Sequence, residues 1–165
     1  MAENKKKAGI GVIAFIALIL IALGLTTNKT PTPPPDNGVN DQNTEHQISV
    51  ADLTILLEHR FPNAQLMLFD EQYYYVSMDK WQEIFTDVLS NMPKHEVDRF
   101  DCENFAFLTI ARVNERYRLN SIGFAIGMGW SHSFNVFIAD DGVHTLDAET
   151  GEIDLLNVAD LVIMG

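Results

Sequence analysis

The stretch "SFNVFIADDGVHTLDA", residues 133–148, decides the fold class of this 165-residue chain. Two runs rich in aromatic and aliphatic residues flank Asp140-Asp141-Gly142, and an Asp-Gly pair between two such runs is a strong signal for a tight hairpin turn. A similar run precedes them, so strands are predicted at residues 121–130, 133–139 and 143–148. The sequence therefore predicts an antiparallel β-meander.

The chain before the meander shows helical periodicity. Ser49 is followed three residues later by Asp52, which resembles a capping box and opens a predicted helix over residues 49–61. Ser77 is the predicted N-cap of a second helix, which Pro93 closes. The apolar stripe of this second helix consists of Trp81, Ile84, Phe85, Val88 and Leu89. We interpret the stripe as a core face.

A third helix is predicted over residues 102–117, with Asp101 at its N-cap position. Apolar residues surround most of its circumference, which predicts a central and buried helix. Two short strands, residues 64–69 and 73–77, are predicted to form a hairpin. Helices followed by an antiparallel meander indicate an α+β domain.

The amino-terminal residues have a different composition. Lys5, Lys6 and Lys7 precede an uncharged apolar run over residues 8–26. A run of about 18 or more apolar residues can cross a bilayer as a helix, and the lysines favour a cytoplasmic amino terminus. We therefore predict an N-terminal transmembrane helix, a membrane anchor, in residues 1–26, with a cleaved signal peptide as the alternative. The carboxyl-terminal domain is then extracytoplasmic, or secreted after cleavage.

Clustered prolines and polar residues predict an extended linker over residues 27–47, followed by a folded domain at 48–165. From residue 46 onward the chain holds 19 acidic and 7 basic residues, a net charge of −12. Nucleic acid requires a basic surface, so this composition excludes it as a partner. Cationic partners and divalent metals remain compatible with the charge.

Cys102 is the one cysteine of the chain and stands at the predicted start of the third helix. Unpaired backbone N–H groups and the helix dipole favour a thiolate at that position. Asp101 and Glu103 oppose a thiolate unless a cation lies nearby, and a lone cysteine also packs well as an inert core residue. The nucleophilic and the packing interpretations are both open at this point.

A histidine and a carboxylate are candidates to assist the thiol. His132 begins the strand at 133–139, and an imidazolium near the sulfur would offset its acidic neighbours. The hairpin register brings Asp147 beside His132, where a carboxylate fixes the imidazole tautomer. His144 and Glu149 are competitors, because a register slip of one residue exchanges them.

These segments resemble known cysteine peptidases. "DCENFA" (101–106) resembles the bacterial transglutaminase-like cysteine proteinases. "SHSFNVFIADDGVHTLDAETGEI" (131–153) is similar to the papain-like carboxyl-terminal domain of the mushroom agglutinins related to Marasmius agglutinin. The resemblance covers about residues 76–155 and implies a papain-like/transglutaminase-like fold. It implies that Cys102 is the nucleophile, His132 the base and Asp147 the orienting carboxylate, although the agglutinins often carry Glu at the third place.

The resulting hypothesis is a membrane-tethered cysteine peptidase, amidase or acyltransferase. It would act on a peptide or amide bond of a peptide or protein substrate near the membrane surface. The Cys102 backbone N–H is one natural oxyanion-hole donor; the second is open among Gln82, Asn104 and Trp130. The alternative is a non-catalytic binding or structural module on the same scaffold.

The hypothesis requires no cofactor, but calcium is possible. Oxygen ligands suit this hard cation, and the agglutinin relatives are activated by calcium. The acidic side chains that crowd one region are Asp140, Asp141, Asp147, Glu149, Glu152 and Asp154. Their spacing does not match an EF-hand, and solvated turn residues are the simpler explanation. One cysteine and five scattered histidines offer no paired spacing for zinc.

Overall fold

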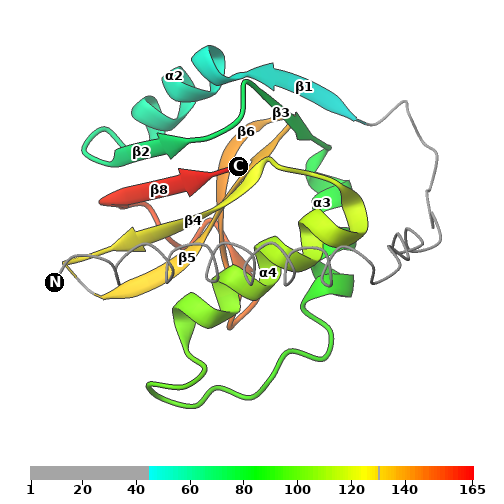
Figure 1. The fold of residues 1–165 in the computed structure, drawn as a ribbon, viewed down its shortest axis with the longest axis vertical. Coiled ribbons are helices and arrows are strands. Elements are labelled where there is room, and N and C mark those ends of the chain that lie inside the picture. The colour runs from blue at the N-terminus through cyan, green and yellow to red at the C-terminus, as the bar shows by residue number, and fades with distance from the viewer. Residues whose placement is uncertain (1–44, 130) are drawn as a thin grey trace, which may run out of the picture. The chain divides into compact units, whose positions relative to one another are not determined.

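A six-stranded mixed sheet organises the residues described by the computed structural model, 45–129 and 131–165. The strand order is β2-β8-β4-β5-β6-β7 (Figure 1). The strands are β2 (Gln65–Leu68), β4 (Ile122–Gly127), β5 (His132–Ala139), β6 (Gly142–Asp147), β7 (Glu152–Ile153) and β8 (Leu161–Met164). A separate pair consists of β1 (His46–Ser49) and β3 (Gln72–Tyr75). The predicted α+β class is confirmed.

The central meander forms as the sequence predicts. Strands β4, β5, β6 and β7 pair antiparallel in succession. Ala139 pairs with Gly142, so Asp140 and Asp141 form the two-residue turn between β5 and β6. The turn also supports a helix, because Asp140 Oδ1 accepts a hydrogen bond of 3.0 Å from the Met78 backbone N–H. A carboxylate there compensates the positive end of the helix dipole.

Three helices pack on the sheet: α2 (Val50–Arg60), α3 (Met78–Val88) and α4 (Cys102–Tyr117). Serine caps fix the first two. Ser49 Oγ accepts the Asp52 N–H at 3.2 Å, and Ser77 Oγ accepts the Lys80 N–H at 3.3 Å. Each cap satisfies a backbone donor that the helix itself leaves unpaired, which explains why these helices start where they do.

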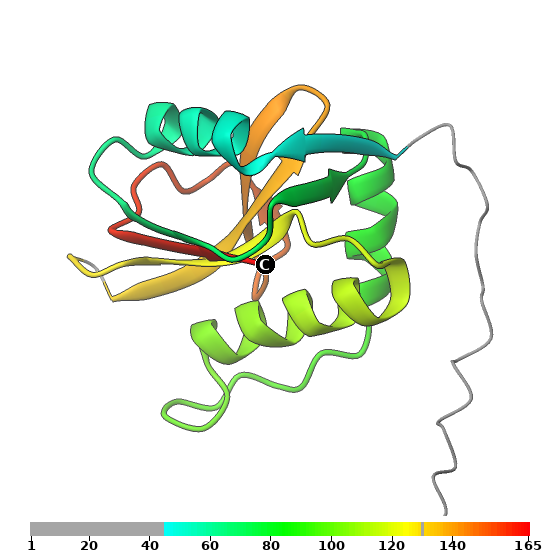
Figure 2. The ribbon, with the colours of Figure 1, turned by 45° about the horizontal axis from the view of Figure 1, so that its top comes forward.

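The two faces of the sheet carry two hydrophobic clusters. Figure 2 shows α2 on one side of the sheet, and α3 and α4 on the other. The side chains of Leu53 and Leu57 from α2 pack with Phe134 of β5, whereas Trp81 from α3 packs with Phe137 of β5. Successive residues of a strand point to opposite faces, so β5 supplies both clusters. This strand is buried over most of its length.

Two local predictions are wrong. Strands β2 and β3 do not form a hairpin, because β2 pairs in parallel with β8 and β3 pairs with β1. Helix α4 is buried on one face only. Phe105 and Val113 lie in the core, whereas the Phe107 side chain is 53% exposed. Residues two apart on a helix do not share a face, so Phe105 and Phe107 point in different directions.

The predicted segments at the amino terminus lie mostly outside the described residues. This applies to the anchor at 1–26 and to most of the linker at 27–47. Strand β1 begins at His46, within the last residues assigned to the linker. No helix in 45–129 or 131–165 has the length and apolar character needed to span a membrane. The anchor stays a prediction.

An acidic side chain joins α3 to the end of α4. Asp87 Oδ2 accepts hydrogen bonds from Arg116 Nη1 at 2.8 Å and from the Tyr117 hydroxyl at 2.9 Å. Burial, followed by the hydrogen bond to Asp87, raises the pKa of Tyr117 from 10.0 to about 12. The bond to Arg116 is the main cause that lowers the pKa of Asp87.

The first prediction concerns the close approach of β4 and β8. A Cβ added to Gly123 would overlap the Ile163 carbonyl oxygen and the Met164 side chain. Overpacking of this kind costs about 1–3 kcal/mol, so Gly123→Ala should lower the free energy of unfolding by that amount in urea denaturation. Gly129→Ala is the matched control, since among the described residues, its chain neighbours aside, no heavy atom lies within 4 Å of its added Cβ. Equal stability of the two variants would contradict the packing described for β4.

The second prediction follows from Tyr117. The folded phenol keeps its proton to a higher pH than the unfolded phenol, so its contribution to stability is complete below pH 10 and is lost as the pH rises toward about 12. Wild type should therefore exceed Tyr117→Phe in free energy of unfolding at pH 8, and this difference should shrink at pH 11. Chemical denaturation of both proteins at the two pH values measures it. A pH-independent difference would count against the raised pKa.

Candidate functional site

Cys102 is the first residue of α4, as the sequence predicts. Asp101 stands at the N-cap, and its backbone N–H donates to Asn104 Oδ1 at 3.2 Å, one half of a capping box. The Cys102 Sγ accepts a hydrogen bond from the Ser133 backbone N–H at 3.4 Å and lies 3.6 Å from Glu103 Oε2. The start of α4 is thereby tied to the start of β5.

His132 and Asp147 meet as the hairpin register predicts. His132 Nε2 lies 3.1 Å from Asp147 Oδ2, and Asp147 is only 8% exposed. The other oxygen of Asp147 accepts the backbone N–H groups of Glu149 at 3.0 Å and Thr150 at 3.3 Å. Glu149 itself is exposed. Asp147, rather than Glu149, is therefore the carboxylate beside the imidazole.

Cys102 meets β5 at the peptide bond between His132 and Ser133, because its Sγ accepts the Ser133 backbone N–H. Asn135 faces α4, since its Nδ2 donates to the Ala106 carbonyl at 3.0 Å, and Ser133 shares that face. Phe134 belongs to the cluster on the α2 face, and His132 shares its parity. The contact between Cys102 and β5 is made by a backbone N–H. The roles of nucleophile, base and orienting carboxylate stay predictions.

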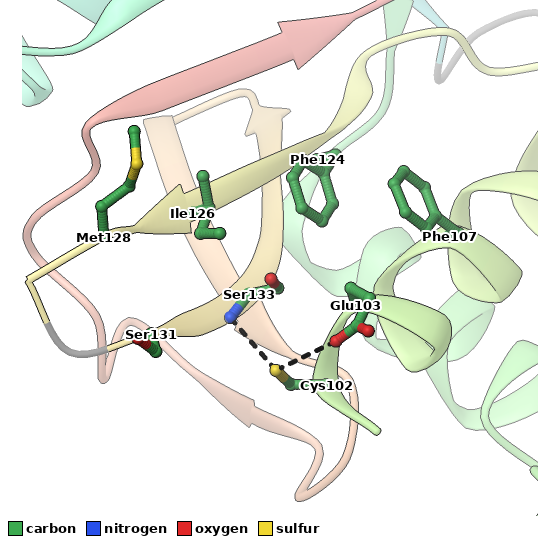
Figure 3. A pocket seen from close by; sticks show the side chains of 8 residues that line it. All are labelled: Cys102, Glu103, Phe107, Phe124, Ile126, Met128, Ser131 and Ser133. Carbon is green, nitrogen blue, oxygen red and sulfur yellow. Dashed lines mark hydrogen bonds between the residues drawn. The ribbon is translucent and has the colours of Figure 1, made fainter. Parts of the chain in front are cut away.

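A cavity of about 480 Å³ opens beside Cys102, between the first half of α4 and the strands β4 and β5 (Figure 3). Its walls divide into a polar and an apolar part. The polar part consists of Cys102, Glu103, Ser131 and Ser133. The apolar part consists of Phe107, Phe124, Ile126 and Met128. Such a mixed lining is typical of small-molecule sites, which combine apolar walls with a few polar groups.

The apolar wall presents an aromatic surface to solvent. The rings of Phe107 and Phe124 stack with their centroids 4.6 Å apart and their planes at 10°. Phe124 lies in β4 and is 9% exposed, so the exposed ring of Phe107 packs on a ring that is itself almost buried. Met128 extends this surface and is 66% exposed. The sequence prediction missed this wall because it assigned Phe107 to the core.

Four of the six acidic residues considered for calcium have other partners. Asp141 Oδ1 and Asp154 Oδ2 each lie 2.7 Å from a ring nitrogen of His144. Asp140 holds the start of α3, and Asp147 holds the imidazole of His132. Within 45–129 and 131–165, no group of three or more His, Cys, Asp or Glu side chains is arranged to hold a metal ion. Calcium binding stays a prediction.

The second oxyanion-hole donor stays a prediction. Gln82 is exposed on α3, and the Asn104 side chain is engaged at the N-cap. Trp130 lies outside the described residues.

The solved structures that share this fold include PSL1a and the Polyporus squamosus lectin. PSL1a, in a complex with E64, matches with a TM-score of 0.56 and 19% sequence identity over 71% of this chain. The Polyporus squamosus lectin, bound to the human-type influenza-binding epitope Neu5Acα2-6Galβ1-4GlcNAc, matches with a TM-score of 0.52 and 17% identity over 71% of this chain. The match covers 51% and 49% of those chains, so this chain spans about half of their length.

No family model matches the chain, and no curated protein matches it. At 17% and 19% identity, the two structures show the fold alone.

These comparisons correct the sequence interpretation. The expected kinship with papain-like/transglutaminase-like cysteine peptidases, closest to the Marasmius-type agglutinin domain, is wrong, because the matching structures are PSL1a and a lectin. The expected peptidase, amidase or acyltransferase activity, and with it the description as a hydrolase or thiol protease, is overturned by the same finding. The alternative, a non-catalytic binding module, agrees better with it.

The third prediction separates the two carboxylates that the sequence left open. Asp147→Ala removes three hydrogen-bond contacts from a buried position and should lower the free energy of unfolding by about 2–3 kcal/mol. Glu149→Ala changes an exposed side chain and should stay within about 0.5 kcal/mol of wild type. Urea denaturation of both variants measures the difference. A larger loss for Glu149→Ala would contradict the register at the end of β6.

Proposed function

We propose that the protein is a non-catalytic binding module that holds a sugar in the cavity beside Cys102. The observation that carries the proposal is the exposed ring of Phe107, backed by Phe124, in the wall of a cavity of about 480 Å³. This volume falls within the range of about 300–1,000 Å³ that is typical of ligand sites. The expected partner is therefore a glycan and not a peptide substrate.

A sugar ring matches the two kinds of wall. One face of a pyranose ring is lined by C–H groups, which pack on the negative face of an aromatic ring. Phe107 offers such a face at 53% exposure, and Met128 extends it with an adaptable thioether. A large apolar surface that remains in water is a sign of a binding site.

The polar wall supplies hydrogen bonds for the hydroxyl groups of the sugar. The Glu103 carboxylate accepts from a hydroxyl, while the hydroxyls of Ser131 and Ser133 both donate and accept. Ser133 is held in place, because its backbone N–H already donates to Cys102 Sγ. A site that combines a rigid aromatic wall with such groups can orient a sugar as well as hold it.

In this proposal Cys102, His132 and Asp147 serve binding. Cys102 forms part of the polar wall. The His132–Asp147 contact of 3.1 Å holds the start of β5, the segment that carries Ser131 and Ser133 into the cavity. The fold match to the Polyporus squamosus lectin, which binds a glycan, supports the proposal.

The fourth prediction tests the aromatic wall. Wild type should give a saturable binding isotherm with at least one neutral glycan, and Galβ1-4GlcNAc is the first probe for titration calorimetry. Phe107→Ala should weaken this binding at least about tenfold, since an aromatic anchor contributes about 1.4 kcal/mol or more. Phe69→Ala is the matched control: Phe69 is 68% exposed and does not line the cavity.

Two results would overturn the proposal. One is the absence of binding on a broad glycan array that includes neutral and acidic sugars. The other is an equal affinity of wild type and Phe107→Ala for every glycan that binds, because the aromatic wall would then carry no binding energy. Unfolding curves of both phenylalanine variants exclude a loss of fold as the cause.

A further inference from the structure

We infer that the cavity selects neutral and amine-bearing sugars and rejects acidic sugars, and that Glu103 is the residue that sets this selectivity. This inference rests on the proposed function and names the chemical class of its ligand.

Glu103 brings a negative charge into the cavity wall. It is half-buried in the first turn of α4, and its side chain points toward the cavity in Figure 3. Its Oε2 lies 3.6 Å from Cys102 Sγ, and a thiol is only a weak hydrogen-bond donor. The carboxylate therefore has accepting capacity left for a ligand.

No lysine or arginine forms an ion pair with Glu103 within the part of the chain that the structure describes. The ion pairs of lysine and arginine there join Arg60 to Asp154, Lys80 to Glu83, Arg99 to Glu96 and Arg116 to Asp87. Glu103 is in none of them. The basic residue nearest in sequence, Arg99, is 76% exposed and engaged with Glu96 at 2.7 Å.

The other described residues that line the cavity do not supply a positive charge either. Its described lining holds no lysine, arginine or histidine. Residue 130, outside the described residues, is a tryptophan, which carries no charge. A second acid stands close by, because Asp160 Oδ2 accepts the backbone N–H of Met128 at 2.7 Å. The negative field of these two acids adds to that of the whole chain, whose net charge is −12.

A carboxylate on the ligand would meet this negative field without a partner. Like charges in a partly desolvated site repel, whereas an ammonium group would pair with Glu103 and a hydroxyl would donate to it. The site therefore discriminates by charge as well as by shape, and the repulsive element is Glu103. The sialylated epitope named for the lectin structure carries such a carboxylate and makes a direct probe.

The fifth prediction compares Galβ1-4GlcNAc with its sialylated form Neu5Acα2-6Galβ1-4GlcNAc by titration calorimetry. Wild type should bind the neutral glycan at least about tenfold more tightly than the sialylated one at low salt. Glu103→Gln keeps the shape and removes the charge, so the ratio should fall to about threefold or less. Higher ionic strength should reduce the wild-type ratio as well, because salt screens the repulsion.

Glu115→Gln is the matched control, an exposed glutamate of the same helix outside the cavity, and should keep the wild-type ratio. Equal or tighter binding of the sialylated glycan by wild type would overturn this inference and leave the proposed function standing. An unchanged ratio in Glu103→Gln would remove the assignment to Glu103. If wild type binds no glycan, the proposed function fails, and this inference fails with it.

Discussion

The structure around the cavity depends on one buried amide. Asn135 is fully buried, and its Nδ2 donates both to the Ala106 carbonyl of α4 at 3.0 Å and to the Gly123 carbonyl of β4 at 3.1 Å. A buried amide is stable only where its donors are satisfied, so these bonds hold α4 at a fixed distance from β4 and β5. The cavity lies further along the same contact between α4 and the strands, beside Cys102, Phe107 and Phe124.

The contact of α4 with the strands β4 and β5 also explains why polar and apolar groups share one site. At the end of α4 that carries Cys102, the helix meets β5 through a backbone N–H of Ser133. One turn further on, Phe107 reaches across to Phe124 of β4. The thiol and carboxylate therefore stand at one end of the cavity and the aromatic rings at the other. A ligand with one polar and one apolar face fits this order, as a sugar does.

Signals that act within a few residues made much of the fold predictable. The pairing of strands far apart in the chain could not be predicted from such signals. The Asp-Gly turn predicted the meander, and Ser49 and Ser77 predicted the starts of two helices, because these signals act within a few residues. The register that brings Asp147 to His132 follows from the same turn. The β2–β3 hairpin was wrong because β2 finds its partner in β8, far along the chain. The peptidase interpretation rested on the likeness of short segments, and the fold matches to PSL1a and a lectin overturned it.

The parallel pair β2–β8 has a consequence for the order of folding. Gln65 pairs with Leu161, about 96 residues later, and β8 also stands between β2 and β4 in the sheet. The meander can assemble from neighbouring segments, but β2 has no place to join until β8 has been synthesised and docked on β4. Contacts so distant in sequence slow folding, because a long loop must close before they form. On the ribosome, β2 would wait as an unpaired apolar strand, the stage at which the nascent chain is most exposed to aggregation.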